Sequence, residues 1–468
     1  MSLTDSAAVD VARSASLASR HLATLSNGAR NDALTALHQA LDRNRDAILA
    51  ANARDVEAAT RAANDGTLNH SVLKRLDLSR PGKYEDMLQG ILNVRDLEDP
   101  GVPPPWPPYD FGKVTLRTLL DEGLTLERVS CPIGVLLIIF EARPEVIANI
   151  AALAIKSGNA AILKGGKESM ESFVAIANVV SEAIAGSQVP VSSVQLVKTR
   201  DAVSSLLAQD SFIDLVIPRG SNELVRFVKE NTKIPVLGHA DGLCSAYIHS
   251  DAKIDTAVKV VVDSKTDYPA ACNALESLLV NETVLETIFP AVATALLNKG
   301  VSLRCDPASK AALAKTLKAD QLAQVSSATE ADYDTEFLDL VLAVKTIPES
   351  GSPELAVEAA VAHINTHSSK HTDIILTESR ELANSFMNGI DSAGVFWNAS
   401  SRFADGMRFG FGTEVGISTN KIHSRGPVGL EGLTIYKYLI RGNGHGAGDY
   451  HDGPGGRKYL HTNLPISE

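Results

Sequence analysis

Apolar residues recur over the first ninety or so positions at the three- and four-residue spacing of amphipathic helices. The stretch 33–42 (ALTALHQALD) is an example, and we expect helices over roughly residues 5–95. Residues 98–108 contain six prolines and predict a loop. After this loop, residues 112–120 and 124–129 predict two strands.

A run of buried-type strands alternating with helices follows. Residues 134–140 (GVLLIIF) are continuously apolar and β-branched, which is typical of a strand covered on both faces of a parallel sheet. A helix over 145–156 that stops at Gly158, a strand at 160–164 and a helix from Lys167 come next. Two further strands are predicted at 193–197 and 215–218. The alternation predicts a doubly wound α/β sheet with right-handed crossovers.

A second α/β unit is predicted to begin near Ala257. Its expected strands include residues 278–280, 301–304, 340–344 and 373–376. From Gly442 onward the chain is rich in Gly, His and Asp and shows no periodicity, so we expect this tail to be loosely ordered or to pack on a neighbour.

Composition narrows the class of protein. The 468-residue chain is 44% hydrophobic, 21% charged and carries a net charge of -12, which argues against a nucleic-acid or acidic-membrane binder. None of its four cysteines forms a C-x-x-C pair, so neither a structural zinc site nor a disulfide framework is indicated, and a reducing compartment is expected. We find neither a membrane-spanning apolar run nor a secretory signal pattern, and expect a cytoplasmic protein.

Cys272 is the first candidate for chemistry. It stands after a polar, Pro-containing segment and just before an apolar run, within residues 264–280. At a loop-to-helix junction, unpaired N–H groups and the helix dipole lower a thiol's pKa, and the thiolate can attack a carbonyl. The alternative is a small buried side chain between alanines, since free cysteine is among the most buried residue types.

Two glycine-containing strand ends are candidate anion sites. The motif G-x-G-x-x-G is absent. At residues 164–169 (KGGKES), two glycines permit close approach, two lysines supply positive charge and a helix is predicted to start, as at a helix N-terminus that binds an anion. An exposed turn with solvated lysines is the alternative. Residues 218–223 (PRGSNE) repeat the pattern more weakly.

Two further loops carry candidate polar groups. Residues 238–244 (GHADGLC) place His239 and Asp241 between glycines, as in a ligand loop or a plain turn, and Cys244 is interpreted as structural. Residues 398–416 alternate glycines with aromatics and include two arginines suited to carboxylate or phosphate recognition, or merely exposed on a packed connection.

Together these segments resemble the gamma-glutamyl phosphate reductase family of the aldehyde dehydrogenase superfamily over roughly residues 15–440. The resembling motifs are 132–135 (PIGV), 140–144 (FEARP), 156–160 (KSGNA), 163–167 (LKGGK), 267–274 (DYPAACNA), 402–406 (RFADG), 414–423 (EVGISTNKIH) and 426–432 (GPVGLEG).

The resemblance implies reduction of L-glutamate 5-phosphate to L-glutamate 5-semialdehyde with NADPH, in proline biosynthesis. Cys272 is then the nucleophile that forms a thioester and expels phosphate, and its backbone N–H is the first oxyanion donor. The superfamily's second donor is an asparagine whose place is taken here by Ala142, which leaves Asn273 or Arg143 as candidates.

The resemblance also assigns the cofactor residues. NAD-preferring members place a glutamate three residues after the ribose-binding lysine; here Lys167 follows Lys164 at that spacing, with Gly165 and Gly166 between, which predicts NADP. The pyrophosphate-facing turn matches Gly220 and Ser221, and the pair that holds the nicotinamide ribose matches Glu336 and Phe337.

Substrate contacts are assigned by charge. Arg143, Arg402 and Arg408 are expected to meet the phosphate and carboxylate, and Asp267 or Asp241 the ammonium. No metal ligand is assigned.

The implied fold has an NADP-binding Rossmann-type domain, a second α/β catalytic domain and a small β oligomerisation element. The expected boundaries are 1–111 and 131–255, 256–421, 112–130 with 422–442, and a tail over 443–468. We expect a homodimer or larger homo-oligomer, a contact with glutamate 5-kinase, and no nucleic-acid or membrane partner.

Two competing functions remain at this point. A hydrolytic aldehyde dehydrogenase needs a water-activating glutamate, which is missing from the corresponding stretch 237–242 (LGHADG). A scaffold that kept the fold without activity needs neither the cysteine nor the lysines and glycines at the strand ends.

Overall fold

The chain forms two compact units in a computed structural model, which describes residues 3–68, 73, 75–100, 112–198, 202–349 and 351–466. Unit 1 comprises Met1–Leu237, Phe411–Gly416 and Val428–Glu468. Unit 2 comprises Gly238–Gly410 and Ile417–Pro427. Most of the expected proline-rich loop lies outside the described residues.

Unit 1 begins with the predicted helices. They are α1 (Ala8–Leu22), α2 (Asn27–Arg43), α3 (Arg45–Asn64) and α5 (Lys83–Asp96). The start of α2 is fixed by Ser26, whose hydroxyl accepts a hydrogen bond from the backbone N–H of Ala29. The three- and four-residue apolar spacing therefore predicted these helices correctly.

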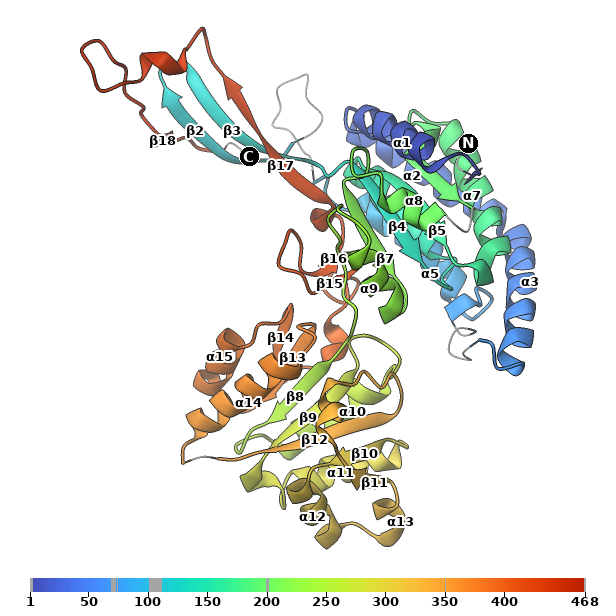
Figure 1. The fold of residues 1–468 in the computed structure, drawn as a ribbon, viewed down its shortest axis with the longest axis vertical. Coiled ribbons are helices and arrows are strands. Elements are labelled where there is room, and N and C mark those ends of the chain that lie inside the picture. The colour runs from blue at the N-terminus through green and yellow to red at the C-terminus, as the bar shows by residue number, and fades with distance from the viewer. Residues whose placement is uncertain are drawn as a thin grey trace. The chain divides into compact units, whose positions relative to one another are not determined.

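A five-stranded parallel sheet forms the centre of unit 1 (Figure 1). Its strands are β1 (Leu3–Thr4), β4 (Val135–Phe140), β5 (Ala160–Gly165), β6 (Val194–Val197) and β7 (Leu215–Arg219), in the order β1-β6-β5-β4-β7. Every pairing is parallel, which confirms the prediction from the apolar runs. Gly158 ends α6 (Val146–Ser157) in the left-handed conformation that favours glycine.

Helices cover both faces of this sheet. Alternate residues of β4 enter two different cores: Leu136, Ile138 and Phe140 lie in one, and Val135, Leu137 and Ile139 in the other. The first core includes residues of α2, α5, α6 and α7 (Met170–Ala185); the second includes residues of α1, α8 (Ala202–Leu207) and α9 (Asn222–Glu230).

The strand order of this sheet reverses beside β4. The chain moves from β4 to β5 and β6 on one side and then returns to β7 on the other. In open α/β sheets, ligands bind outside the carboxyl ends of the strands at such a switch point. Residues that directly follow β4 and β7 are therefore candidates for contact with a ligand of unit 1.

Unit 2 is built on a seven-stranded parallel sheet in the order β11-β10-β12-β9-β8-β13-β14 (Figure 1). The strands are β8 (Cys244–Ile248), β9 (Leu275–Asn281), β10 (Ser302–Cys305), β11 (Val325–Ser327), β12 (Val341–Ile347), β13 (Thr372–Leu376) and β14 (Gly394–Trp397). Its helices are α10 (Ile254–Thr266), α11 (Phe289–Asn298), α12 (Pro307–Thr316), α13 (Ala319–Leu322), α14 (Pro353–His367) and α15 (Arg380–Gly389).

The start of unit 2 differs from the expected boundary at 255/256. Strand β8 pairs with β9 and β13, so it belongs to the second sheet, and the unit begins at Gly238. The functions expected of the two domains stay predictions.

A four-stranded antiparallel sheet completes unit 1. Its order is β17 (Thr434–Arg441), β3 (Leu124–Pro132), β2 (Val114–Asp121) and β18 (Thr462–Asn463). Strand β17 lies at the edge of this sheet and falls within the expected segment 422–442. A two-stranded ribbon joins β15 (Gly416–Ser418) and β16 (Gly426–Val428).

The C-terminal tail is more ordered than expected. Strand β18 pairs with β2, and Arg457 forms an ion pair with Asp121 at 2.7 Å. The hydroxyl of Tyr450 donates to the same carboxylate, and its ring stacks on Tyr459. The tail was expected to be loosely ordered or to pack on a neighbour; in the structure these aromatic and charged side chains bind the chain's own sheet. No helix in the described ranges is both long and apolar enough to cross a membrane.

Candidate active site

Four candidate side chains lie at one edge of the unit 2 sheet. His239, Cys272, Glu336 and His371 precede β8, β9, β12 and β13 respectively along the chain. Because these strands are parallel neighbours, their amino ends meet at the same edge of the sheet. Residues far apart in sequence are therefore brought together there.

The local structure around Cys272 differs from one premise of the sequence argument. The apolar run after it is strand β9, buried along its whole length, and no helix begins there. The thiol consequently gains nothing from a helix dipole. Cys272 itself is half-buried in the turn that connects α10 to β9.

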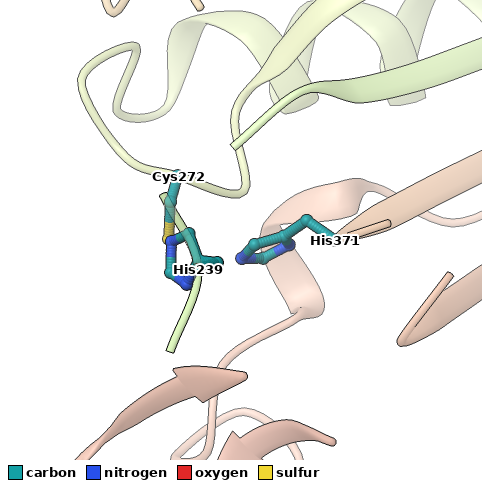
Figure 2. Close-up of side chains that lie close together, drawn as sticks. All are labelled: His239, Cys272 and His371. Carbon is teal, nitrogen blue, oxygen red and sulfur yellow. The ribbon is translucent and has the colours of Figure 1, made fainter. Parts of the chain in front are cut away.

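Two imidazoles, rather than the expected helix N-terminus, lower the pKa of the Cys272 thiol. One nitrogen from each of His239 and His371 and the Sγ of Cys272 lie within 4.8 Å of one another. Figure 2 shows the Cys272 sulfur beside the His239 ring, with the far edge of the His371 ring turned toward both. Burial raises the pKa of the Cys272 thiol, but the positive charges of His371 and His239 outweigh it and hold this pKa well below its usual range. The arrangement favours a thiolate.

Hydrogen bonds orient the two rings. The Nδ1 of His239 lies 2.8 Å from the carbonyl oxygen of Ile417; because a carbonyl only accepts, Nδ1 carries a proton, and Nε2 is the nitrogen that can gain or lose one. His371 is 1% exposed, its Nδ1 lies 2.9 Å from the hydroxyl of Thr372, and its Nε2 makes no hydrogen bond to any described residue. The rings meet edge to face with centroids 5.1 Å apart.

Gly242 lets two chain segments approach closely beside the thiol. A Cβ at this position would lie 2.2 Å from the carbonyl oxygen of Cys272 and 2.7 Å from Oε1 of Glu336. The backbone N–H of Gly242 donates to the same carboxylate at 2.9 Å. A side chain at position 242 would therefore collide with Cys272 and Glu336, so this position of the loop requires glycine.

The charge of the Cys272 thiolate affects the pKa of the nearby Glu336 carboxyl. The pKa of this carboxyl is raised to about 7, and burial is the largest cause. The hydrogen bond from the Gly242 N–H lowers this pKa, and the negative charge of the nearby Cys272 thiolate raises it. Asp241 is half-buried in the adjacent loop, and Phe337 lies beneath the guanidinium of Arg304 at 4.8 Å. The expected contacts of Glu336 and Phe337 with a nicotinamide ribose stay predictions.

Three candidate substrate residues of unit 2, Asp267, Arg402 and Arg408, form one cluster. The carboxylate of Asp267 accepts hydrogen bonds from Arg402 at 3.1 Å and Arg408 at 3.2 Å. Asn273 is buried; its amide donates to the carbonyl of Ala404 at 2.9 Å, and its oxygen accepts from Arg402. These contacts make Asn273 a support of the Cys272 loop, and its role as oxyanion donor stays a prediction.

The first group of expected cofactor residues lies at the end of β5 in unit 1. Lys164 is 8% exposed, its ammonium donates to the carbonyl of Gly165 at 2.7 Å, and burial lowers its pKa although Glu168 opposes this. A Cβ on Gly165 would lie 1.8 Å from the ring of Phe173, so only glycine fits. Gly166 is half-buried beside the Glu168 carboxylate, and Lys167 is exposed.

The second group lies at the switch point of that sheet. Gly220 and Ser221 directly follow β7, and Arg143 follows β4. The backbone N–H of Ser221 donates to Glu141 at 2.9 Å, and a Cβ on Gly220 would lie 2.5 Å from the same carboxylate. Ser221 also caps α9. Because Glu141 occupies the Ser221 N–H, the expected contact of Gly220 and Ser221 with a pyrophosphate stays a prediction.

The sequence analysis gave no role to His371. It left open whether the loop that contains His239 binds a ligand or is a plain turn. The available signal was a histidine directly before a buried strand, in the run SSKH at 368–371. Using it requires the strand order, because only the pairing of β13 with β8 and β8 with β9 brings His371 to Cys272.

Comparison with known proteins now identifies the chain's relatives. Residues 115–334 match the aldehyde dehydrogenase family. The chain is 55% identical to a probable gamma-glutamyl phosphate reductase of Schizosaccharomyces pombe, covering 95% of this chain and 94% of the relative, and 50% identical to the gamma-glutamyl phosphate reductase of Saccharomyces cerevisiae, covering 98% and 99%.

A solved structure agrees with these sequences. The crystal structure of gamma-glutamyl phosphate reductase from Thermotoga maritima matches with a TM-score of 0.83 at 35% identity, covering 94% of this chain and 99% of that one. The chain therefore belongs to the gamma-glutamyl phosphate reductase family, with the aldehyde dehydrogenase fold.

Proposed function

We propose that the chain reduces L-glutamate 5-phosphate to L-glutamate 5-semialdehyde and releases phosphate, through a thioester on Cys272. The observation that carries the proposal is a thiol grouped with two imidazoles, in a chain 55% identical to a probable gamma-glutamyl phosphate reductase. A thiolate so placed is the nucleophile that acyl transfer requires. The product places the enzyme in proline biosynthesis.

The proposed chemistry starts with attack of the Cys272 thiolate on the acyl carbon. The bond from that carbon to the phosphate oxygen breaks, and phosphate leaves with the electron pair. The backbone N–H of Cys272 supports the oxyanion. His239, with its Nδ1 proton held by Ile417, keeps Nε2 available to take the thiol proton. After reduction, collapse of the thiohemiacetal returns the thiolate and frees the aldehyde.

A bound nicotinamide cofactor supplies the hydride that reduces the thioester, and we propose NADPH. Gly220 and Ser221 at the switch point suit the pyrophosphate, and Glu336 and Phe337 are the proposed ribose contacts. Lys164 and the exposed Lys167 add positive charge at the end of β5, which favours a 2′-phosphate. Gly165 and Gly166 let the backbone approach the cofactor.

Substrate orientation is assigned to the charged groups near Cys272. Arg402 and Arg408 are proposed to receive the carboxylate or phosphate, which would loosen their pairing with Asp267 and leave that carboxylate for the ammonium. Asp241 is the other proposed ammonium partner. Arg143 belongs to unit 1 and is proposed as an additional anion contact.

A hydrolytic aldehyde dehydrogenase is the second candidate function. The observation that favours it is the Glu336 carboxyl, whose pKa of about 7 suits a general base that activates water. Against it, stretch 237–242 contains no glutamate at the place where the hydrolytic enzymes carry theirs.

Phosphate dependence separates the two functions. With glutamate 5-semialdehyde and NADP+, the reductase turns over continuously only when phosphate or arsenate accepts the acyl group. The rate of NADPH formation, followed by absorbance with and without phosphate, is the measurement. Equal sustained rates in both buffers would show hydrolysis and refute the proposal.

We also propose that the enzyme is a cytoplasmic homodimer or larger homo-oligomer. Strand β17 forms the edge of its sheet, and its residues Ile435, Tyr436, Tyr438 and Ile440 are between 40% and 62% exposed. An exposed apolar edge strand is suited to pairing with a second chain. Contact with the glutamate 5-kinase that supplies the labile acyl phosphate is part of the same proposal.

A further inference from the structure

The cluster of His239, Cys272 and His371 has a second chemical capacity besides nucleophilic attack. Among the described residues it is the one group of three whose side chains are arranged to hold a metal ion. We propose that these three side chains form a Zn²⁺ site and that bound zinc shuts off the enzyme. The inhibitory part of this inference rests on the proposed function of Cys272.

The distances suit an open three-ligand site. The two imidazole nitrogens and the sulfur lie within 4.8 Å of one another. Ligand atoms bonded to zinc at about 2.0–2.3 Å lie roughly 3.3–3.8 Å apart in a tetrahedron. Closing the cluster around an ion therefore needs shifts on the order of 1 Å, within the reach of side-chain rotation.

Outer hydrogen bonds already orient the donors. Metal-binding histidines usually donate their second ring N–H to a carbonyl or another acceptor, as His239 does to Ile417 at 2.8 Å. The Nδ1 of His371 is held by the Thr372 hydroxyl at 2.9 Å. These contacts leave Nε2 of each ring as the nitrogen for an ion.

His371 supplies the independent sign of a ligand. Its side chain is 1% exposed, yet its Nε2 has no hydrogen-bond partner among the described residues. Buried polar atoms are nearly always paired, and the groups that this nitrogen faces are the sulfur of Cys272 and the second imidazole. Figure 2 shows this edge of the ring turned toward Cys272 and His239. A metal ion satisfies all three donors at once.

The donor set selects the metal. A thiolate and two imidazoles suit Zn²⁺, whereas Mg²⁺ and Ca²⁺ require oxygen ligands. Binding forms one Zn–S and two Zn–N bonds, and any proton that the sulfur or either coordinating ring nitrogen carries goes to solvent, with no change in oxidation state. The half-buried positions of Cys272 and His239 leave the fourth position to water.

A sulfur bonded to zinc cannot attack the acyl phosphate. Zinc should therefore inhibit the reduction. The inhibition should weaken when the substrate concentration is raised, and a chelator should reverse it. Zinc should also protect Cys272 from alkylation, because both events use the same electron pair.

The test is equilibrium dialysis of the full-length enzyme against ZnCl₂, followed by metal analysis. We expect one zinc per chain, with affinity lowered at least about 10–100-fold in Cys272→Ser and in His371→Ala. His367→Ala is the matched control: it removes the His363–His367 pair of α14, whose ring centroids are 4.4 Å apart, and should leave zinc binding unchanged. Cobalt in place of zinc should give a thiolate charge-transfer band in the wild type that Cys272→Ser lacks.

Full zinc binding by Cys272→Ser, or its loss in His367→Ala, would overturn the site. If His371→Ala does not fold, alkylation of wild-type Cys272 with iodoacetamide, read by peptide mass spectrometry, decides instead: protection by ZnCl₂ supports the site, and an unchanged rate refutes it. The two proposals fail separately. Zinc binding without glutamyl phosphate reduction in zinc-free buffer would refute the function alone, and reduction without zinc binding would refute the site alone.

Discussion

Cys272 owes its reactivity to neighbours that are remote in the sequence. The sequence argument placed the thiol at a helix start, but the activating charges come from His239 and His371. The motif at 267–274 was enough to propose Cys272 as the nucleophile, whereas the origin of its low pKa was not accessible from the sequence, because it depends on which strands pair. The same holds for position 242, which requires glycine because the backbone of Cys272 approaches it closely.

The first prediction concerns the pH dependence of that thiol. An ordinary thiol, with a pKa of about 8.5, is about 50% thiolate at pH 8.5 and only about 1% thiolate at pH 6.5. Because the pKa of Cys272 is lowered, its thiolate persists over this range and is lost only when the pH falls through the lower value. The rate of alkylation by iodoacetamide at the Cys272 peptide should therefore change little between pH 8.5 and 6.5.

In His239→Ala and His371→Ala the same measurement should show a steep fall with decreasing pH. Cys305 serves as an internal control, since burial raises its pKa to about 12 and it should stay unmodified throughout. Equal profiles in the wild type and both variants would contradict the role of the imidazoles.

The second prediction concerns cofactor choice at Lys167. A glutamate there would repel a 2′-phosphate and accept a hydrogen bond from a 2′-hydroxyl. Lys167→Glu should lower kcat/KM for NADPH by about tenfold or more and raise the ratio in favour of NADH. Glu171→Gln, at an exposed acid of α7, is the control. An unchanged ratio would mean that the 2′-phosphate is held elsewhere.

Among the elements, strands buried on both faces were the most predictable. Residues 134–140 and 160–164 carry continuous apolar runs, and the structure places β4 and β5 there. The short run after Cys272 was ambiguous, because an apolar stretch of this length fits a helix or a strand until its partners are known. The order of the C-terminal tail was unpredictable for a different reason. Its contacts with β2 come from few residues, including Tyr450 and Arg457, and these carry no periodic signal.

The third prediction concerns the buried ion pair that joins α10 to β9. Lys265 and Glu276 lie 2.7 Å apart with side chains 0% and 1% exposed. Removing one partner leaves a buried charge without compensation, so Lys265→Met should lower the free energy of unfolding by about 3–5 kcal/mol in urea titrations. The double variant Lys265→Met/Glu276→Leu should regain most of it.

An exposed ion pair provides the matched control. Lys315→Met breaks the contact with Glu286, whose side chains are 64% and 61% exposed, and should cost less than about 1 kcal/mol. Equal effects of Lys265→Met and Lys315→Met would show that burial does not govern the contribution of these pairs.

At the scale of the whole molecule, the sequence predicted two α/β units and a small β element, and the structure contains two parallel sheets and a four-stranded antiparallel sheet. The expected boundary at 255/256 leaves residues 244–248 in the first unit, whereas in the structure they form β8, which pairs with β9 and β13. Sequence order alone does not tell which sheet a strand joins.

The fourth prediction tests whether β17 joins chains. Replacing Tyr438 and Ile440, 57% and 62% exposed, by aspartates places charge on the proposed contact strand and should reduce the mass measured by light scattering to that of one chain. Leu17→Asp, at a 62% exposed position of α1, is the control and should leave the mass unchanged. The same mass for the β17 variant and the wild type would place any subunit contact elsewhere.

The acylation of Cys272 is the claim on which the enzymatic account depends. The most direct measurement mixes the enzyme with glutamate 5-semialdehyde and NADP+ without phosphate, quenches in acid and analyses the peptides by mass spectrometry. The account predicts one NADPH per active site in a single burst, a glutamyl group on the peptide containing Cys272, and its loss when phosphate is added before the quench. Sustained NADPH formation with an unmodified Cys272 would contradict it.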